Sequence, residues 1–550
     1  MNLHVARSKS STASLLIVFA TCFVAVLAAH APLLRLPYYW DEAGYYIPAA
    51  FDFFRTGSLI PYSTLTNAHP PLPSIYLALW WKLFGFSPPV TRTAMCFVAA
   101  IMLTAVWKIA VRTTGRGSVA TATVMLTAIY PIVFVQSSLA HADLFAAAAT
   151  LWAIAFLLDR TPRGVWAATA AFSLAALSKE TVIVTPLALA GWQLWRYLRE
   201  RSRLRTENGI TGVSGMDRPA LRLSTATILA APIGPLVLWY LYHWHRTGFI
   251  FGNPEYLRYN AGTTLDPLRI LLALGHRILH VTAHMNLFVP VLLMAACMIL
   301  PPVSDKDGSS RDRIAFSDQA IFYVAIAANV LLFSVLGGAL LTRYLLPLYP
   351  LVLLLCVNTF RRRLRRWPAL VALSGVAFVT GIFVNPPYRF APEDNLAYRD
   401  VILLHQAAIG QIVAHFPHDT VLTAWPATDE LSKPELGYVQ QPVKVTSIDN
   451  FSFGQVQKAR EEPGSYSAAL LFSTKYDPPH LFMSLGPANE KLDRRFFDFH
   501  SDLDPPAVAR ILNGDLVWRA QRKGQWAALL HFDRITEAGL RKGAFSRSEE

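Results

Sequence analysis

An acidic pair, Asp41 and Glu42, stands among five aromatic residues in the segment from Tyr38 to Tyr46. A charge at the centre of a bilayer costs about 2.5–3.5 kcal/mol on insertion scales, so acids kept in a highly apolar chain face a cavity or take part in chemistry. A carboxylate can act as a general base or ligate a metal, and aromatic rings can stack on a sugar. We therefore predict catalytic roles for Asp41 and Glu42 and substrate-binding roles for Tyr45 and Tyr46. A divalent metal at the pair is left open.

Further ionisable residues stand at the borders of apolar runs, where a membrane protein meets water. His69 lies in Asn67-Ala68-His69-Pro70-Pro71-Leu72, and Lys179 and Glu180 lie in a short polar break between two runs. The predicted topology places these residues on the same side of the membrane as the acidic pair. We therefore predict one site, with substrate contacts from His69, His141, Asp143 and Glu180 and cations from Lys179 and Arg343.

The composition is that of a membrane protein. Of the 550 residues, 53% are hydrophobic and 16% are charged. Apolar runs close to the roughly 20 residues needed to cross a bilayer recur from Leu15 to Val384, which leaves no room there for a large soluble domain. The net charge of +14 could indicate nucleic acid, but the positive residues concentrate in short loops such as Arg361–Arg366. Membrane orientation explains those loops, so we expect no nucleic-acid partner.

Eleven membrane-spanning helices are predicted, and the charges of the loops set their orientation. If Pro71–Phe86 is an interfacial helix on the outer surface, every later basic loop faces the cytoplasm, as the positive-inside rule requires. Counting Pro71–Phe86 as a span would move those loops outside. The predicted spans are Ser14–Ala28, Arg92–Val111, Val119–Val135, Ala142–Leu158, Val165–Leu177, Val182–Leu198, Thr225–Tyr242, Leu287–Leu300, Ile321–Leu336, Tyr344–Phe360 and Ala369–Val384.

The first apolar run has features of a signal sequence. Arg7 and Lys9 precede it, and Ala29-His30-Ala31 imitates a signal-peptidase site. We favour a retained signal anchor, because cleavage would release the segment of the acidic pair from its nearest membrane tether.

The sequence after residue 385 changes in character. Its charges are mixed, helical and strand patterns alternate, and it contains no cysteine. We predict a transmembrane domain over 1–385, with a catalytic outer loop at 32–91, and a soluble α/β domain over 386–550. The predicted elements are helices at Val401–His415 and Phe453–Arg460, strands at Thr420–Ala424, Val443–Ile448 and Ala468–Ser473, and paired strands at Leu516–Arg519 and Trp526–Phe532.

Two segments carry weaker signals. Trp425–Glu430 follows a predicted strand and is the best candidate there for a functional loop, with helix capping by Thr428 or Asp429 as the alternative. His276, His280 and His284 recur at the spacing of neighbouring zinc ligands. Helical positions eight apart are separated by about 12 Å, so one ion cannot join all three, and an interfacial helix is the favoured interpretation.

The motifs together resemble a known family. Asp-Glu in the first outer loop, His69-Pro70-Pro71-Leu72 after it, Ser178-Lys179-Glu180-Thr181 between two spans and Arg343-Tyr344-Leu345-Leu346-Pro347 late in the chain are similar to the GT-C membrane glycosyltransferases. Within that fold, residues 10–385 look like the protein O-mannosyltransferase and lipid A aminoarabinose transferase group, whose members use polyprenyl-phosphate sugars. The chain departs from the family's Arg-x-x-x-x-Asp pattern at Ser138–Asp143, which leaves the role of His141 open.

The resemblance implies a polytopic α-helical GT-C fold and a hexosyl or pentosyl transferase at the extracytoplasmic face of a bacterial inner membrane. The donor would be a polyprenyl-phosphate sugar and the acceptor a lipid, a glycan or a protein. A departing phosphate needs nearby cations, so Lys179 and Arg343 are assigned to donor-phosphate binding, together with Tyr344 from the same Arg-Tyr motif. Asp41 is assigned as the base for the acceptor hydroxyl. A single attack on the anomeric carbon inverts configuration, whereas retention would require a second acid such as Asp143 or Glu180.

Each assignment has a structural alternative. Asp41 could cap an outer helix, and Glu42 could pair with a cation or face water. His69 could satisfy a loop carbonyl. Lys179 and Glu180 could form a self-contained ion pair, and Arg343 could extend from the end of a span to the membrane surface.

Two other functional classes remain open. A transporter would also place charges in a membrane cavity, but it should show paired repeats or broken helices in matching positions, and the sequence shows neither. A non-catalytic scaffold of envelope assembly would keep the spans without needing clustered acids, histidines and cations.

Overall fold

The structure is a computed structural model, and it divides into two compact units. It describes residues 12–66, 68–207, 217–254, 265–305, 308, 310–336, 338–476, 487–497 and 499–532. The first unit contains residues 1–35, 45–386 and 393–396, and the second contains residues 36–44, 387–392 and 397–550.

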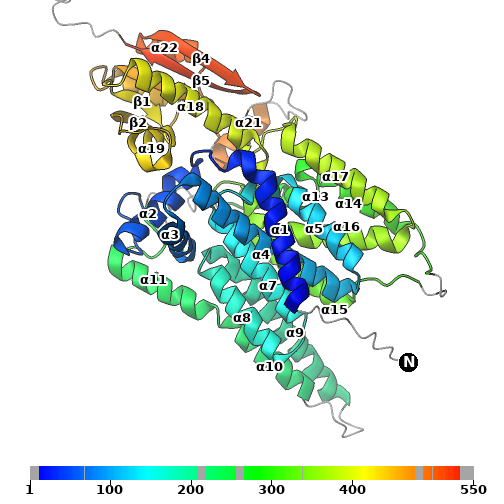
Figure 1. Cartoon of the computed structure of the whole chain (residues 1–550). Coiled ribbons are helices and arrows are strands. Elements are labelled where there is room, and N and C mark those ends of the chain that lie inside the picture. The colour runs from blue at the N-terminus through cyan, green and yellow to red at the C-terminus, as the bar shows by residue number, and fades with distance from the viewer. Residues whose placement is uncertain are drawn as a thin grey trace, which may run out of the picture. The chain divides into compact units, whose positions relative to one another are not determined.

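The described part of the first unit is helical (Figure 1). Its α-helices are α1 (Thr12–His30), α2 (Ile47–Thr56), α3 (Leu72–Phe84), α4 (Pro88–Thr114), α5 (Gly117–Ile129), α6 (Pro131–Gln136), α7 (Ala142–Leu157), α8 (Pro162–Ala176), α9 (Val184–Glu207), α10 (Asp217–Ala230), α11 (Ile233–Thr247), α13 (Pro267–Thr282), α14 (Phe288–Met298), α15 (Phe316–Val335), α16 (Tyr349–Arg363) and α17 (Trp367–Phe383). Short turns of other helical types are η1 (Ala31–Leu33), η2 (Glu42–Tyr46), η3 (Glu180–Ile183), η4 (His284–Asn286), η5 (Thr342–Leu345) and η6 (Pro392–Asp394).

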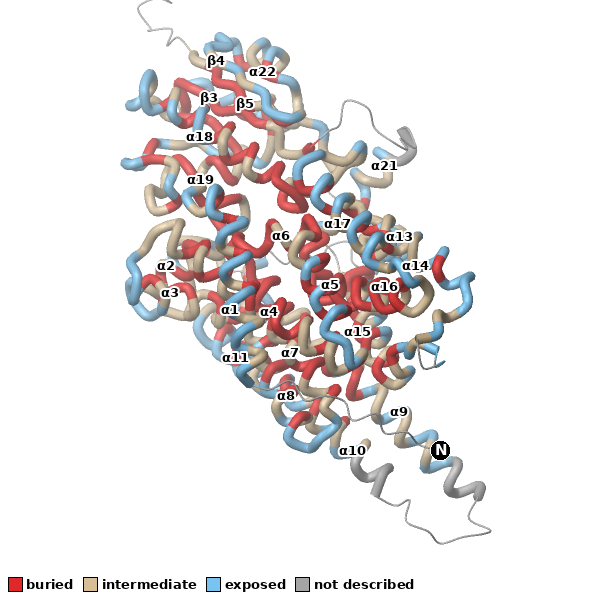
Figure 2. Tube along the Cα trace, turned by 45° about the vertical axis from the view of Figure 1, so that its right-hand side comes forward, coloured by how far each residue is buried: buried red, intermediate tan, exposed pale blue. Residues whose placement is uncertain are grey.

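The core of this unit is built around α4. Helices α1, α5 and α7 pack against it, and α8 packs against α7. Within its most apolar window, 72% of the residues of α4 are buried inside the protein, compared with 11% for α1 (Figure 2). The difference indicates that α4 is a central helix, whereas the apolar surface of α1 is left for lipid.

Four described helices are long and apolar enough to cross a bilayer, namely Thr12–Leu33, Pro88–Thr114, Arg222–Thr247 and Phe316–Val335. A fifth is obtained if the pair Pro267–Asn286 and Phe288–Met298, bent by 98°, is counted as one span. The predicted count of eleven is not reached by this criterion. One reason is that several predicted spans are shorter or interrupted: Val119–Val135 is divided at Pro131 into α5 and α6, because proline cannot donate the next helical hydrogen bond. Helix α3 has 13 residues, about 20 Å, which is short for a span.

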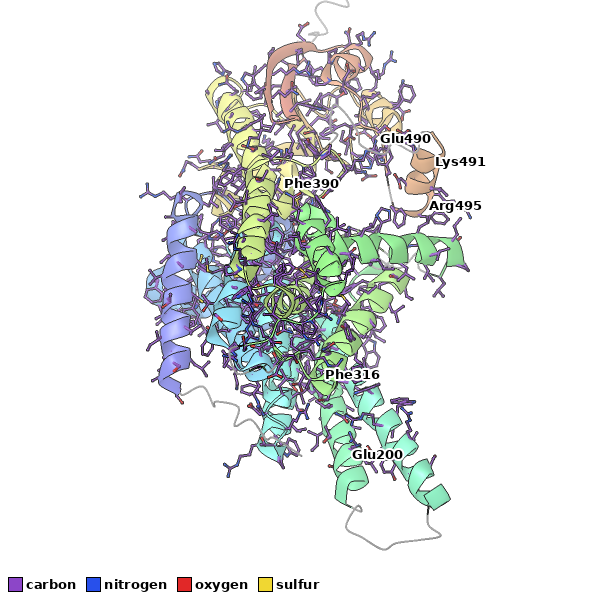
Figure 3. The ribbon with its side chains drawn as sticks, turned by 90° about the vertical axis from the view of Figure 1, so that its right-hand side faces the viewer. Glu200, Phe316, Phe390, Glu490, Lys491 and Arg495 are labelled. Carbon is purple, nitrogen blue, oxygen red and sulfur yellow. The ribbon has the colours of Figure 1, made fainter. Side chains whose placement is uncertain are left out.

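The loop over Glu200–Asp217 is partly helical. Helix α9, which carries Glu200 (Figure 3), continues to Glu207, and Glu200 forms a 2.7 Å ion pair with Arg222 of α10. The rest of that loop, residues 208–216, lies outside the described residues.

Two buried arginines of α13 hold the C-terminal end of α15. Arg269 donates to the carbonyls of Ser334, Val335 and Leu336 at 2.7–3.3 Å, and Arg277 donates to Phe333 O at 3.3 Å and Leu341 O at 2.7 Å. The last carbonyls of a helix have no partner within it, and α15 has no basic residue in its last turn. The arginines therefore supply these hydrogen bonds from a neighbouring helix.

We expect Arg269→Ala to lower the thermal stability of the purified protein. The substitution leaves helix-end carbonyls without their donors, and each unsatisfied buried group costs about 1–3 kcal/mol. Thermal unfolding in detergent should show a lower midpoint than wild type. Arg366→Ala, at an exposed position, is the matched control and should leave the midpoint unchanged.

The second unit contains a five-stranded sheet with strand order β2-β1-β3-β5-β4. Strand β1 pairs in parallel with β2 and β3, while β5 pairs antiparallel with β3 and β4. The elements are α18 (Ala397–His415), β1 (Val421–Ala424), α19 (Ala427–Ser432), η7 (Pro434–Leu436), β2 (Val445–Ile448), α20 (Phe453–Arg460), β3 (Ala468–Phe472), α21 (Pro487–Phe496), α22 (Pro505–Leu512), β4 (Asp515–Arg522) and β5 (Gln525–His531). The predicted helices, strands and closing hairpin are confirmed within a few residues.

The segment Leu36–Gly44, which carries the acidic pair, clusters with this second unit. Tyr38 N donates to Leu436 O at 3.3 Å, and Tyr438 donates its hydroxyl to Tyr38 O at 3.0 Å. A Cβ on Gly44 would lie 2.6 Å from the ring of Trp425, so this position requires glycine. The division thus differs from the predicted boundary, because part of the predicted loop 32–91 packs with residues after 397.

Candidate functional site

The acidic pair lies in a tight turn of the second unit. Glu42 is fully buried, and its Oε2 accepts a hydrogen bond from the backbone N–H of Tyr39 at 2.9 Å. Asp41 is only half-buried. The ring of Tyr39 packs edge-on against Tyr398 of α18 at 5.8 Å. Glu42 therefore stabilises the turn, and Asp41 is the more accessible acid of the two.

Four charged side chains form a buried ion-pair cluster in the first unit. Asp143 Oδ1 lies 2.5 Å from Lys179 Nζ, and Asp143 Oδ2 lies 3.2 Å from Arg343 Nε. Arg343 also donates through a terminal nitrogen to Glu393. Each of these four residues, called the charge cluster below, is at most 5% exposed. Two cations and two carboxylates sum to zero charge, which is how such groups are tolerated away from water.

Three members of the charge cluster lie at or near the N-terminal ends of helical segments. Asp143 is in the first turn of α7, Lys179 immediately precedes η3, and Arg343 lies within η5. A carboxylate in the first turn of a helix is favoured by the exposed N–H groups there. Next to the cluster, Lys179 Nζ lies 3.8 Å from the ring centroid of Tyr344, and that ring stacks on Phe333 at 5.2 Å.

A histidine–carboxylate pair lies one residue along the chain from the charge cluster. His69 Nδ1 is 2.8 Å from Glu180 Oε2, and the ring of His69 stacks on Tyr46 with centroids 5.9 Å apart. Burial raises the pKa of Glu180, but His69 and the neighbouring Lys179 lower it more, so the pKa falls below its ordinary value. Glu180 is therefore ionised at neutral pH and holds His69 in one orientation.

His141 is fully buried. Its Nδ1 lies 2.8 Å from Gln136 Oε1, and its ring lies 5.7 Å from that of Tyr46. Burial and the positive charges of Arg343, Lys179 and Arg92 lower the pKa of His141 well below its ordinary value. His141 is thus neutral, and among the described residues its Nε2 has no hydrogen-bond partner.

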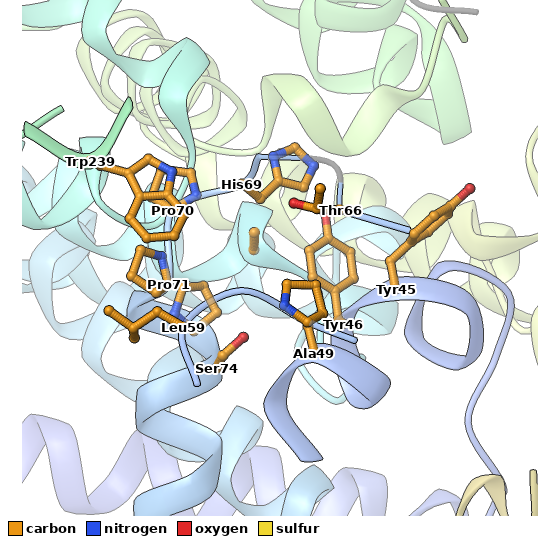
Figure 4. A pocket seen from close by; sticks show the side chains of 13 residues that line it. Tyr45, Tyr46, Ala49, Leu59, Thr66, His69, Pro70, Pro71, Ser74 and Trp239 are labelled. Atoms are coloured by element: carbon orange, nitrogen blue, oxygen red, sulfur yellow. The ribbon is translucent and has the colours of Figure 1, made fainter. Parts of the chain in front are cut away.

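A pocket opens beside His69 (Figure 4). It has an empty volume of about 450 Å³, including its mouth. Tyr45, Tyr46 and Trp239 supply aromatic walls, and Thr66, His69 and Ser74 supply polar groups. The remaining lining is mostly proline and aliphatic side chain, including Pro70, Pro71, Pro73 and Ala142.

Comparisons with known proteins agree on the fold. The dolichyl-phosphate-mannose-protein mannosyltransferase family matches residues 68–214. The crystal structure of ArnT from Cupriavidus metallidurans bound to undecaprenyl phosphate is similar, with a TM-score of 0.50 and 16% identity, over 94% of this chain and 98% of that one. The apo structure of the same ArnT gives a TM-score of 0.51 with the same identity and coverage. No curated protein matches by sequence.

The chain has the GT-C membrane-glycosyltransferase fold. At 16% identity the similarity to ArnT establishes the fold and not the chemistry of individual residues. A further, weaker similarity is to the archaeal oligosaccharyltransferase AglB from Archaeoglobus fulgidus, with a TM-score of 0.42 and 10% identity over 83% of this chain and 69% of that one.

Within this GT-C chain, the structure brings together most of the predicted site residues. One group consists of Tyr46, His69 and Glu180, and the ring of His141 contacts that of Tyr46. A second group consists of Asp143, Lys179, Arg343 and Tyr344. Tyr45 lines the pocket. Asp41 and Glu42 belong to the other compact unit.

Two structural alternatives drawn from the sequence are wrong. Lys179 and Glu180 do not pair with each other, because Lys179 binds Asp143 and Glu180 binds His69. Arg343 does not extend to the membrane surface, since it is 2% exposed and joins two carboxylates.

Sequence reasoning missed several residues of the site. Glu393 follows the last predicted span, and the sequence assigns it to the C-terminal domain. The acidic pair Glu393-Asp394 soon after an apolar run could have indicated a role in the site. Arg92 is fully buried and donates to Ser138 O at 2.8 Å, which holds the turn that leads to His141. Trp239 was counted only as part of a span, and nothing local indicated that it lines a pocket.

No metal centre is evident among the described residues, where no three histidine, cysteine, aspartate or glutamate side chains are grouped as metal ligands. The rings of His276 and His280 are 6.4 Å apart, and those of His280 and His284 are 5.2 Å apart. His284 instead bonds Asp394 through Nε2 at 2.8 Å.

Proposed function

We propose that this protein is a glycosyltransferase that moves a sugar from a polyprenyl phosphate to a lipid, glycan or protein acceptor at the extracytoplasmic face of the membrane, with inversion of configuration. The observation that carries the proposal is the buried meeting of Lys179 and Arg343 beside Tyr344 in a chain with the GT-C fold. Two buried cations that share one carboxylate, Asp143, suit a site where a phosphate can take the place of that carboxylate.

The charge balance of the cluster determines how a phosphate would bind. The two cations are already neutralised by Asp143 and Glu393, so an additional buried anion would be uncompensated. We infer that the donor phosphate takes the place of Asp143 on Lys179 and Arg343. Asp143 is the member that contacts both cations, and its release would leave each of them one open position.

The proposed transfer is a single displacement. The acceptor hydroxyl attacks the anomeric carbon, the bond from that carbon to the phosphate oxygen breaks, and the polyprenyl phosphate leaves with the electron pair. Asp41 takes the hydroxyl proton, and Lys179 and Arg343 stabilise the charge that develops on the leaving phosphate. Because the leaving group is already an anion, it requires no general acid.

The test of the function is transfer by the purified protein. Undecaprenyl-phosphate hexoses and pentoses would be supplied with membrane extracts from cells that lack the protein. Mass spectrometry should show a new glycosylated product and release of undecaprenyl phosphate. Failure of every donor to react, with a folded protein, would contradict the proposal.

One bent helix pair, α13 and α14, is found among the described helices, whereas a transporter would be expected to have broken helices in matching positions.

Asp143→Asn should increase the stabilisation that undecaprenyl phosphate gives to the protein. The substitution removes the anion that competes for Lys179 and Arg343, while it leaves two buried cations under-compensated in the free protein, a loss of about 3–5 kcal/mol. We therefore expect a lower melting temperature without lipid and a larger upward shift with lipid than in wild type. Asp159→Asn, at a partly exposed carboxylate that pairs with Lys108 and Arg112, is the control. An unchanged or smaller shift in Asp143→Asn would contradict the exchange.

The proposed orientation predicts which surfaces an impermeant thiol reagent can reach in intact cells. A cysteine at Glu462, an exposed position of the second unit, should react, and one at Arg163, an exposed position in the first turn of α8, should be protected until the membrane is opened. The four native cysteines are buried and should contribute little background. The opposite pattern would place the site on the cytoplasmic face.

A further inference from the structure

The pocket beside His69 is formed by segments that other contacts hold in place. Trp239 donates from its indole N–H to Ala68 O at 2.9 Å, and Leu72 N donates to Leu177 O at 3.2 Å. Thr66 Oγ1 lies 2.8 Å from His243 Nε2. These bonds attach Thr66 and Ala68 to α11 and Leu72 to the end of α8, so the pocket is largely formed before any ligand binds.

The lining of the pocket fits a sugar ring better than other parts of a lipid donor. Tyr46 and Trp239 offer flat apolar faces, and His69, Thr66 and Ser74 offer polar atoms at the edges. Pyranose and furanose rings have the same division, with C–H faces and hydroxyl edges. A polyprenyl chain would leave the polar atoms unsatisfied, and a second phosphate would meet the negative charge of Glu180.

The His69–Glu180 pair gives this pocket a hydrogen-bonding group of fixed direction. Ionised Glu180 accepts a hydrogen bond from His69 Nδ1 at 2.8 Å, which fixes the orientation of the imidazole and of its Nε2. The ring lies nearly parallel to that of Tyr46, with an interplanar angle of 12°. A sugar hydroxyl, which can both donate and accept a hydrogen bond, is a complementary group.

The pocket and the charge cluster are adjacent at two points of the chain. Lys179 of the cluster precedes Glu180 of the pair, and Ala142 of the pocket lining precedes Asp143 of the cluster. Consecutive Cα atoms are about 3.8 Å apart. A sugar linked directly to a phosphate on Lys179 therefore has this pocket within reach.

We propose that the pocket lined by Tyr46, His69 and Trp239 binds the sugar ring of the polyprenyl-phosphate donor, with His69 oriented by Glu180 to form a hydrogen bond with a sugar hydroxyl. This inference rests on the proposed function and adds to it the place where the donor sugar is recognised. It assigns discrimination between sugars to the His69 pocket and affinity for the phosphate to the charge cluster.

The experiment compares bare undecaprenyl phosphate with undecaprenyl-phosphate sugars, beginning with the mannosyl and glucosyl lipids, in binding to the full-length protein in nanodiscs. Wild type should bind its preferred sugar lipid about tenfold or more tightly than the bare lipid. His69→Ala and Glu180→Gln should reduce that ratio to about one and leave the dissociation constant of the bare lipid unchanged. Arg343→Ala should instead weaken both lipids. His276→Ala, at an exposed histidine, is the matched control.

A second variant guards against a folding defect. Ala49→Leu fills part of the pocket with a larger side chain and removes no polar contact. It should also abolish the preference for the sugar lipid. The proposal is overturned if wild type shows no preference, or if folded His69→Ala and Ala49→Leu proteins keep it. Absence of binding by every polyprenyl phosphate lipid, bare or glycosylated, would count instead against the proposed function as a whole.

Discussion

Asp41→Asn should lower the rate of sugar transfer by about 10²–10⁴-fold, the range typical for loss of a general base. The amide is nearly the same shape as the carboxylate but cannot take a proton from the acceptor hydroxyl. The turn itself should persist, because Glu42 accepts the hydrogen bond from Tyr39 N and Gly44 packs on Trp425. Expression, melting temperature and binding of undecaprenyl phosphate should therefore match wild type.

The measurement is single-turnover transfer from a saturating donor, so that chemistry is separated from binding and product release. Asp515→Asn, at an exposed position of β4, is the control for loss of a carboxylate from the same unit. Glu42→Gln provides a contrast, since Glu42 is buried and bonded to the backbone; its main effect should be on stability. A folded Asp41→Asn protein with near wild-type turnover would remove Asp41 from the mechanism.

The second large effect is expected at Arg343. Its guanidinium binds Asp143 through Nε and Glu393 through a terminal nitrogen, and one ammonium group cannot reproduce both directions. Arg343→Lys keeps the charge but loses a charge-assisted hydrogen bond, worth about 1.5–3 kcal/mol, so kcat/KM for the donor should fall roughly 10–100-fold. Arg343→Ala should be worse, because it also leaves buried carboxylates without their cation.

Stability must be measured beside donor use at this position, because Arg343→Ala also disturbs the cluster in the free protein. Undecaprenyl phosphate should raise the melting temperature of Arg343→Ala much less than that of wild type. Lys179→Ala should weaken donor use in the same direction, and the double variant should be less than additive if both cations act on one phosphate. Arg366→Lys is the control for a conservative change at an exposed arginine. Normal donor affinity and turnover in folded Arg343 variants would move the phosphate site elsewhere.

Elements governed by local pattern were predictable. Two helices and the five strands after residue 397 were predicted within a few residues because alternation and helical periodicity are visible in short windows, whereas the short helices α19, α21 and α22 were not predicted. The GT-C fold could be expected from the motifs at the acidic pair, at His69, at Lys179 and at Arg343, since each is a short run at the border of an apolar segment. The count of eleven spans was less secure, because interruptions such as that at Pro131 divide runs that hydropathy reads as continuous.

Pairings between distant residues were decided by tertiary structure. The identities of Lys179, Glu180 and Arg343 indicated charges near one site, but adjacency in sequence suggested a Lys179–Glu180 pair. In the fold the two side chains separate, one to Asp143 on α7 and the other to His69 before α3, because a buried charge is stable only where packing brings an opposite charge and hydrogen bonds to it. Glu393 and Trp239 also reach the site through tertiary packing. Segments that are distant in the chain bring them there, and no local pattern encodes that approach.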